Sequence, residues 1–246
     1  MKIKNIFFSL GRSIAASFCP GCLKNDSIFD HTIASIPEAS GISYCAFTNT
    51  LVVANDEGKF YEITPNGDIL AIHSVGNYDL EGVVCEDDRF IFAIENGDLL
   101  GVNRKTLQQN LYPLEKIKKL GKKSGIEGIA KVGDNYLLTI QTKDKEEASF
   151  MLVAITEGKT KVLKAIHHGI IDSAGLDYKD GILYIVSDKK DKLYLYDLEK
   201  EKEIKKIKLP SLALEGVALD EKGNIFFADD NGAILRYTLE ELKLGK

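Results

Sequence analysis

The chain has 246 residues, of which 44% are hydrophobic and 28% are charged, and its formal net charge is −5. This length suffices for one large all-β domain or two average ones, and the composition is that of an ordinary globular protein. The acidic balance and the dispersed basic residues argue against a nucleic-acid partner. In the body of the chain, no apolar run reaches the roughly 18 residues that a membrane span requires.

The first 24 residues are predicted to be a leader outside the fold. Lys2 and Lys4 precede the apolar run Ile6–Leu10, and Arg12 separates it from a second apolar or small run, Ser13–Phe18. A positive start followed by an apolar stretch is the order of a secretory signal, but Arg12 breaks that stretch and no clean cleavage site follows. Export, membrane anchoring, and a short amphipathic or disordered segment therefore all remain open.

The four cysteines fall into two pairs. Cys19 and Cys22 form Cys-Pro-Gly-Cys just after the apolar part of the leader. Such a pair can be a redox motif or half of a zinc site, but zinc needs two more ligands and the chain has no second pair of this spacing. The sequence therefore assigns Cys19 and Cys22 no function. Cys45 and Cys85 lie at apolar strand positions and are predicted to be thiols in the core.

A short motif, in its full form Glu-Gly-apolar, recurs five times with Glu in three of the copies. The copies are Ala39-Ser40-Gly41-Ile42, Leu80-Glu81-Gly82-Val83, Ile126-Glu127-Gly128-Ile129, Ser173-Ala174-Gly175-Leu176 and Leu214-Glu215-Gly216-Val217. The spacing is roughly 40 to 50 residues, and a period of this length that contains only strands is typical of propeller blades.

Each motif is followed by strand, turn and strand. After Gly216, apolar runs at Val217–Leu219, Ile225–Ala228 and Ala233–Tyr237 are separated by turn residues. One such unit cannot bury both of its faces, so the units must stack around an axis. The predicted fold is an all-β, five-bladed β-propeller with about four antiparallel strands in each blade.

The two ends of the chain are predicted to close the ring. The last unit has room for three strands before the charged tail Leu239–Lys246, so we expect Ser27–Ile36 to supply its missing outer strand. A six-bladed ring with one degenerate blade is the alternative, but five units already use every residue after the leader. Residues 25–246 are therefore predicted to be a single propeller domain, and we expect a monomer.

The motif glutamates are candidate metal ligands. The motif lies at the start of the innermost strand, so Glu81, Glu127 and Glu215 are expected to converge at one mouth of the central channel. Converging carboxylates repel one another unless a cation neutralises them. Ca²⁺, with Mg²⁺ as the second choice, is the simplest cation for such oxygen ligands. The motif glycine is expected to permit a close approach of the backbone or a twist.

A second polar position follows the second strand of each unit. We expect its oxygen atoms on the same face of the ring, and the candidate ligands there are Asn55, Glu95, Asp188 and Asp229. Carboxylates and amides match Ca²⁺ better than zinc. The alternative is that these residues only cap turns, as Asx residues commonly do. His167 and His168 precede the fourth motif and are more simply explained as structural, and no catalytic residue is identified.

Several segments of the chain resemble the SdiA-regulated (YjiK-like) family, and the resemblance covers about residues 30–238. The segments are Gly41-Ile42-Ser43, Asp79-Leu80-Glu81-Gly82-Val83, Gly125-Ile126-Glu127-Gly128-Ile129-Ala130, Leu214-Glu215-Gly216-Val217-Ala218, and Leu51–Gly58 with Phe60–Ile63. The resemblance implies a five-bladed propeller with a bound calcium ion, often preceded by a membrane or export segment. It also implies distant kinship with NHL-repeat and gluconolactonase-like propellers. Ser40 and Ala174 replace the motif Glu, and Glu38 and Asp172, two residues earlier, are candidates to compensate.

Two functions remain open from the sequence. The first is a calcium-binding module for a small ligand or an envelope protein, which the lack of a recognisable acid–base or nucleophile set favours. The second is a metal-dependent hydrolase of the lactonase or phosphoesterase type, in which the same cation activates water. We expect a periplasmic or membrane-anchored protein that contacts the membrane only through its leader, with the cytoplasm as the alternative.

Overall fold

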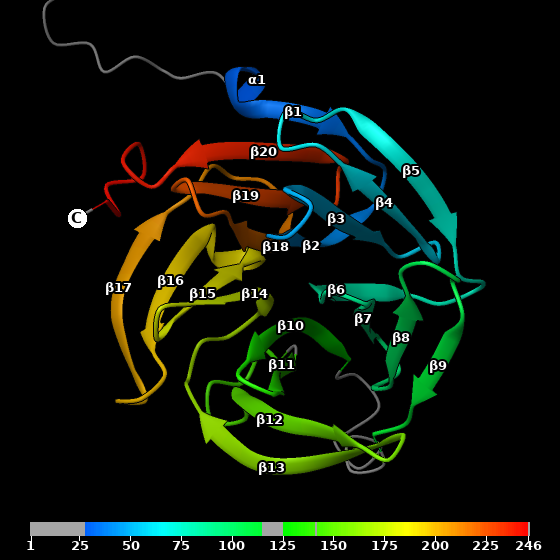
Figure 1. Cartoon of the computed structure of the whole chain (residues 1–246). Helices are drawn as coiled ribbons and strands as arrows, with labels where there is room; N and C mark the ends of the chain where they lie inside the picture. The colour runs from blue at the N-terminus through cyan, green and yellow to red at the C-terminus, as the bar shows by residue number, and fades with distance from the viewer. Residues whose placement is uncertain (1–27, 115–124, 141, 246) are drawn as a thin grey trace, which may run out of the picture.

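The computed structural model describes residues 28–114, 125–140 and 142–245. These residues form five four-stranded antiparallel sheets arranged as blades around a central axis (Figure 1). This arrangement confirms the predicted all-β, five-bladed propeller. The described residues contain no sixth sheet, so the six-bladed alternative is wrong. The predicted leader, with Cys19 and Cys22, lies outside the described residues.

The first three blades follow one another in chain order, each running from an inner strand to an outer one. Blade 1 consists of β2 (Ala39–Cys45), β3 (Thr50–Asn55), β4 (Lys59–Ile63) and β5 (Ile69–Ser74). Blade 2 consists of β6 (Leu80–Cys85), β7 (Arg89–Ile94), β8 (Leu99–Asn103) and β9 (Gln109–Tyr112). Blade 3 consists of β10 (Ile126–Val132), β11 (Asn135–Ile140), β12 (Ser149–Thr156) and β13 (Lys159–His167).

The last two blades repeat the pattern, and the fifth takes one strand from the other end of the chain. Blade 4 consists of β14 (Ser173–Lys179), β15 (Ile182–Ser187), β16 (Lys192–Asp197) and β17 (Lys202–Lys208), with the short 3₁₀-helix η2 (Asp188–Lys190) between β15 and β16. Blade 5 consists of β18 (Leu214–Leu219), β19 (Asn224–Asp229), β20 (Ala233–Thr238) and β1 (Thr32–Ser35).

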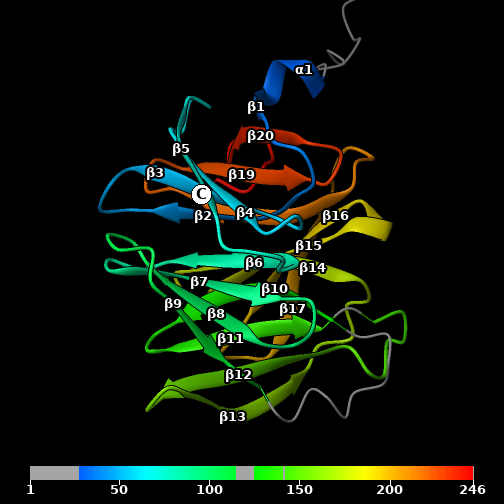
Figure 2. The same ribbon diagram turned by 90° about the vertical axis from the view of Figure 1, so that its right-hand side faces the viewer.

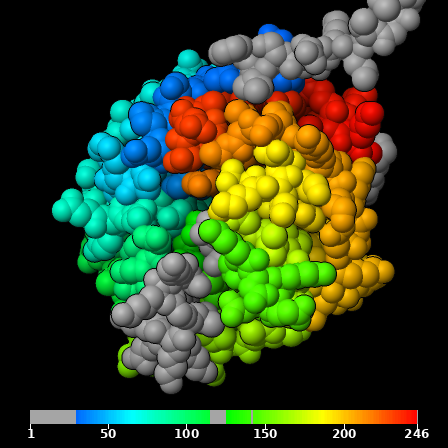
Figure 3. All heavy atoms as spheres, turned by 180° about the vertical axis from the view of Figure 1, so that it is seen from behind, coloured from blue at the N-terminus to red at the C-terminus, as the bar shows by residue number. Residues whose placement is uncertain are grey.

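The N-terminal strand closes the ring, as predicted. β1 follows the one-turn helix α1 (Ile28–His31) and pairs antiparallel with β20, with Thr32 opposite Leu235. Figure 2 shows α1 and β1 beside β20, and in Figure 3 the two ends of the described chain lie together at one edge of the molecule. Of the helices in the described residues, none has the length and apolar character needed to cross a membrane.

The core consists of apolar layers between neighbouring blades. Between blades 1 and 2, the rings of Phe60 and Phe92 lie 5.2 Å apart, and both side chains are fully buried. Between blades 5 and 1, Phe226 packs in one cluster with Ile42 and Leu51. Burial between blades is the main stabilising contribution of a propeller, because no blade can cover both of its own faces.

The motif glycines hold the inner strands together. A Cβ atom on Gly41 would lie 2.2 Å from the backbone oxygen of Glu81, and one on Gly128 would lie 2.2 Å from the backbone oxygen of Ala174. All five glycines contact the motif of the next blade, at residues 81, 129, 174, 215 and 42 in turn. The expected close approach of the backbone is therefore the reason for glycine at this position.

The residue after each motif glycine closes the channel. These side chains are apolar and at most 4% exposed: Ile42, Val83, Ile129, Leu176 and Val217. The cavity that they line with the glycines has a volume of about 10 Å³. A cavity of this size holds no more than one water molecule. The two ends of the channel are thus separate sites rather than the mouths of one open pore.

Cys45 and Cys85 form a disulfide, so their prediction as core thiols was wrong. Their Cα atoms lie 5.4 Å apart, at the ends of the inner strands β2 and β6. The glycine contacts bring these two strands together, which places residues 40 positions apart in the sequence within bonding distance. The disulfide covalently links blade 1 to blade 2.

Candidate metal centre at the channel mouth

The three motif glutamates lie on inner strands of three different blades, at the channel mouth where these strands begin. Glu81 is on β6, Glu127 on β10 and Glu215 on β18, each directly before its glycine. The pairing register of each of these strands shifts at the glutamate, which indicates a β-bulge at this position. The charges of Glu127 and Glu215 act on Glu81, and Glu215 lines the small axial cavity together with the apolar residues that close the channel, so the three glutamates gather at this end of the axis.

Burial and mutual repulsion raise the pKa values of all three carboxyls. Burial raises the pKa of Glu81 to about 10, with the charges of Glu127 and Glu215 as the next causes. The pKa of Glu215 rises to about 8, first through burial and then through Asp230. The pKa of Glu127 rises to about 7, again through burial first, then through nearby carboxylates. Burial disfavours the charged form of an acid, and like charges add to the effect.

These carboxylates lack compensating partners. Within the described part of the chain, no donor hydrogen-bonds the side chain of Glu81, Glu127 or Glu215. The cation that acts on Glu127 is Lys189, whose ammonium is already bound to Asp172 at 3.0 Å. Buried carboxylates are normally paired or metal-bound. Their lack of partners makes the three glutamates candidates for binding a cation.

A second group of carboxylates surrounds the glutamates. Burial and a hydrogen bond with Glu95 raise the pKa of Asp79 to about 6. Burial and then the charge of Asp172 raise the pKa of Asp188. A hydrogen bond with Asp56 is the main cause that raises the pKa of Glu38. The mouth therefore concentrates negative charge well beyond the three motif residues.

The residues after the second strands divide into two kinds. The Asn55 amide donates to the Pro37 carbonyl at 3.1 Å and accepts from the Lys59 backbone, and Asp229 accepts from both nitrogens of Asn231. These two predicted candidates thus serve turns, as the capping alternative described.

In blades 1, 2, 4 and 5, the residue directly after the second strand acts on the motif glutamates instead. Asp56 and Asp230 act on the pKa of Glu215, and the predicted candidates Glu95 and Asp188 belong to the same group. Asp56 also has one buried carboxylate oxygen with no partner in the described structure. The sequence named Asn55 and Asp229, which pair with Ala39 and Leu214 at the ends of their strands, whereas the acids that act on Glu215 are the next residues, Asp56 and Asp230.

In the two blades without a motif glutamate, a carboxylate lies two residues earlier. Ser40 instead donates its hydroxyl to the Leu80 carbonyl in the next blade, and Ala174 is buried. Glu38 and Asp172 both have left-handed backbone conformations, with φ of 50° and 55°. Such conformations are uncommon outside glycine and cluster at functional sites. Asp172 is 2% exposed, and its charge raises the pKa of Glu127. Blade 4 therefore adds a carboxylate to the mouth from a position outside the motif.

The candidate ligand atoms at the mouth are of the kind that a hard divalent cation prefers. All candidate ligands are oxygens, and Ca²⁺ takes six to eight oxygen ligands, Mg²⁺ six. In the described residues, no group of three or more acidic, histidine or cysteine side chains is already arranged to hold a metal ion. The side chains at the mouth, as they stand in the structure, therefore offer suitable ligand atoms without forming a coordination site.

His168 belongs to the core. Its ring stacks on Phe150 with centroids 3.8 Å apart, and its Nδ1 accepts a hydrogen bond from the Ile170 backbone. Burial lowers the pKa of His168 to about 3, so the ring is neutral at physiological pH. This environment agrees with the structural interpretation of the histidine pair.

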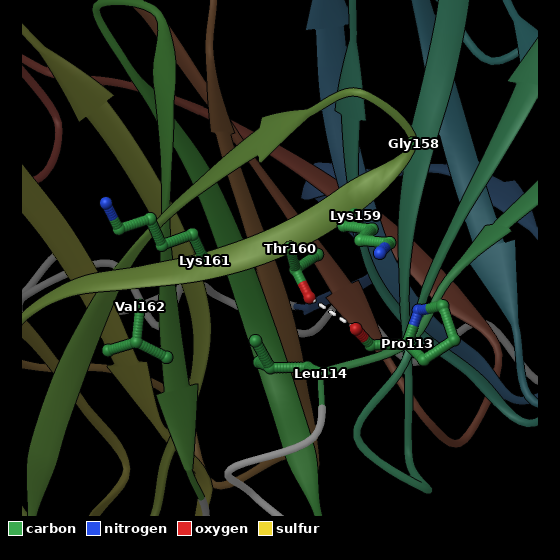
Figure 4. Close-up of a pocket in the computed structure, with 7 residues that line it drawn as sticks. All are labelled: Pro113, Leu114, Gly158, Lys159, Thr160, Lys161 and Val162. Carbon is green, nitrogen blue, oxygen red and sulfur yellow. Dashed lines mark hydrogen bonds between the residues drawn. The ribbon is translucent and has the colours of Figure 1, made fainter.

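A larger hollow lies at the rim, away from the channel (Figure 4). It has a volume of about 540 Å³ and is lined by Pro113, Leu114 and Gly158–Val162. The Thr160 hydroxyl donates to the Pro113 carbonyl across it, and no carboxylate lines it. Leu114 is the last described residue before residues 115–124, so only part of the surroundings of this hollow is described.

The fold and the acidic mouth define a five-bladed propeller with a candidate cation site on its axis. A family model described as SdiA-regulated matches residues 26–231, and the chain belongs to the SdiA-regulated family. No curated protein matches the chain. Among solved structures, the chain is similar to the glutaminyl cyclase of Myxococcus xanthus, with a TM-score of 0.64, 12% identity, and coverage of 84% of this chain and 92% of that one. At this identity the similarity shows the fold alone.

Proposed function

We propose that this protein is a calcium-binding propeller that acts as a ligand- or protein-binding module at the cell envelope. The observation that carries the proposal is the group of three motif glutamates at the channel mouth, one buried and two half-buried, which have raised pKa values and no hydrogen-bond donors in the described structure. Bound Ca²⁺ would neutralise Glu81, Glu127 and Glu215 and would lock three blades together at the axis. Mg²⁺ is the second choice, because it demands a more regular octahedral site.

The disulfide supports a location outside the cytoplasm. Disulfides form and persist in the periplasm and other oxidising compartments, whereas cytosolic thiols are kept reduced. The link between Cys45 and Cys85 thus agrees with export or anchoring through the N-terminal leader. The partner in this compartment is proposed to be a small ligand or an envelope protein that covers the mouth.

A metal-dependent hydrolase is the second candidate, and one observation favours it. Glu81, with a pKa of about 10, holds a proton at neutral pH, while Glu127, with a pKa of about 7, is divided between its two forms. Neighbouring acids of different pKa are the usual pattern of acid–base pairs in active sites. A bound cation would supply Lewis-acid activation of water or of an ester carbonyl.

Thermal unfolding with and without calcium tests the proposed cation. A 100-fold excess of Ca²⁺ over its Kd adds ~2.7 kcal/mol to the free energy of unfolding, which raises Tm by roughly 5 to 10 °C in a chain of this size. Glu127→Gln should lose most of this shift and keep its fold. Glu199→Gln, in an exposed turn of blade 4, is the matched control and should keep the full shift. If Tm does not respond to calcium, the cation proposal is wrong.

A hydrolase screen separates the two functions. Lactone and phosphoester substrates are offered to the calcium-loaded protein, with EDTA and the Glu127→Gln variant as controls. The binding module predicts no turnover in any arm, whereas the hydrolase predicts turnover that both controls abolish.

A further inference from the structure

The outer strand of blade 1 presents an apolar, uncharged edge. In β5 (Ile69–Ser74), three large apolar side chains are about half exposed: Ile69 at 49%, Leu70 at 57% and Ile72 at 56%. The strand has the sequence Ile-Leu-Ala-Ile-His-Ser, with neither a lysine nor a carboxylate. It lies at the end of its sheet, so one row of its backbone donors and acceptors has no strand partner among the described residues.

The other four outer strands are each protected from edge-to-edge pairing. β13 carries three lysines and β17 carries four, and lysine on an edge opposes pairing with another strand. β9 and β1 are only four residues long, and very short edges are a second protection. Leu163 on β13 and Ile204 on β17 are also exposed, but lysines flank both. Within one ring of five equivalent edges, β5 alone has neither protection.

β5 is firmly attached on its inner side. The ring of His73 stacks on Phe60 with centroids 4.6 Å apart, and its Nε2 lies 3.1 Å from a carboxylate oxygen of Glu62. Backbone pairing with β4 runs from Ile69 to Ser74. The apolar side chains are thus presented on a held strand rather than on a fraying end.

We propose that β5 is the contact strand of a reversible homodimer in which two copies pair antiparallel around a two-fold axis. Such pairing is self-complementary, since each copy offers the same apolar residues to the other. No charge faces its own copy, whereas paired β13 or β17 edges would bring lysine to lysine.

The size of the contact sets its strength. A six-residue strand and three half-exposed side chains bury an area at the low end for specific interfaces, which is typical of transient complexes. The dimer is therefore expected to form in the micromolar range or above, with monomer at lower concentration. This proposal revises the expectation that the protein is only a monomer.

Sedimentation equilibrium of the full chain over a wide concentration range tests the dimer. The wild-type protein should show a reversible monomer–dimer equilibrium that added salt does not weaken. Leu70→Lys places like charges across the two-fold axis and should weaken the dimer at least ~10-fold. Leu163→Lys is the matched control, because it puts the same residue on an outer strand that already carries lysines, and should leave the dimer unchanged. A melting curve checks that both variants fold.

Amide hydrogen exchange locates the contact. Protection of residues 69–74 should increase with protein concentration in the wild type and not in Leu70→Lys. A chain that stays monomeric at all concentrations overturns the proposal, as does a dimer that Leu70→Lys leaves intact. If the protein is monomeric but a synthetic peptide of residues 69–74 binds the edge, the occupant is another extended chain and the homodimer is wrong.

Discussion

The two ends of strand β6 carry buried carboxylates in opposite electrostatic states. Glu81, at the acidic mouth, has a pKa of about 10 and no hydrogen-bond donor in the described structure. Glu86, just beyond the other end of β6, is also buried for the most part, and burial alone would raise its pKa. Hydrogen bonds from Lys131, Arg89 and Tyr136 outweigh that effect and lower it. The same fold thus supplies hydrogen-bond donors to the carboxylate at one end and none to the carboxylate at the other.

This difference separates a structural carboxylate from a candidate ligand. At the Glu86 end, partners from two blades saturate the acid and tie β6 to β10 and β11. At the Glu81 end, several acids converge, and their mutual repulsion reduces the stability of the folded protein. Regions that reduce stability in this way are commonly functional.

Removal of the two carboxyls should have opposite effects on stability, and this is the largest effect we expect. Glu86→Ala leaves Arg89 and Lys131 without their buried partner and should lower the free energy of unfolding by about 3 kcal/mol. Glu81→Ala removes a repelled carboxyl and should be neutral or stabilising in EDTA. Urea unfolding of both variants measures the difference. If both substitutions destabilise the calcium-free protein equally, the contrast between the two ends is wrong.

The glycine ring between the two ends should tolerate no added methyl group. Gly128→Ala places a Cβ atom 2.2 Å from a backbone oxygen of blade 4 and should cost about 2 kcal/mol or more, as overpacking does. Gly133→Ala is the control, because no atom lies within 4 Å of its Cβ position, although its φ of 59° carries a conformational cost. Urea unfolding should rank Gly128→Ala as clearly the more destabilising. An equal loss in both would mean that close approach at the axis is not the reason for the motif glycine.

The calcium-free protein should lose stability as pH rises through the neutral range. The folded-state pKa values of Glu127, about 7, and Glu215, about 8, lie above the ordinary value of 4.5, so the folded state binds more protons than the unfolded one in this window. Through these two carboxyls, the free energy of unfolding in EDTA should fall by on the order of 2 kcal/mol between pH 6.5 and 7.5. Melting curves across this range check it.

Calcium should flatten this pH dependence, and Glu215→Gln should flatten it in part. Glu86 acts in the opposite direction, because its lowered pKa gives stability that is lost only as the pH falls below its ordinary range. A stability that rises with pH in EDTA would contradict the assignment of raised pKa values at the mouth.

Restoring the missing glutamate in blade 4 should give the smallest effect. Ala174→Glu adds a carboxylate to the mouth and should lower the calcium-free stability by about 1 kcal/mol through repulsion. The same change should increase the calcium-induced rise in Tm. Ala174→Gln, of equal size and no charge, controls for packing. If the two variants respond to calcium equally, the position does not face the cation.

The fold was predictable because the repeated motif marks each of the five blades in the sequence. Glycines at 41, 82, 128, 175 and 216 mark five inner strands, and the short last unit indicated that an N-terminal strand closes the ring. The site was predictable only in part. The motif glutamates were found by their repetition, whereas Asp56 and Asp230 were displaced by one residue, because the sequence does not fix the register at a strand end.

The disulfide could not be predicted for a related reason. Cys45 and Cys85 lie four and three residues after their motif glycines, so they do not occupy equivalent positions in the repeat. They meet only because β2 and β6 approach closely across the blade boundary. The partners of Glu86 likewise come from blade 3 as well as blade 2, and contacts between blades leave no periodic signal in the sequence.

Pairing between β1 and β20 has a consequence for how this protein is made. Thr32 can pair with Leu235 only after Leu235 has been synthesised, so the ring stays open until β20 has emerged. Contacts between residues so distant in sequence slow folding. A propeller ring that is still open is more easily passed across a membrane than a closed one, which agrees with the export proposed here. Loss of the last strand would leave an open blade and a free edge, a product that proteases can recognise and remove.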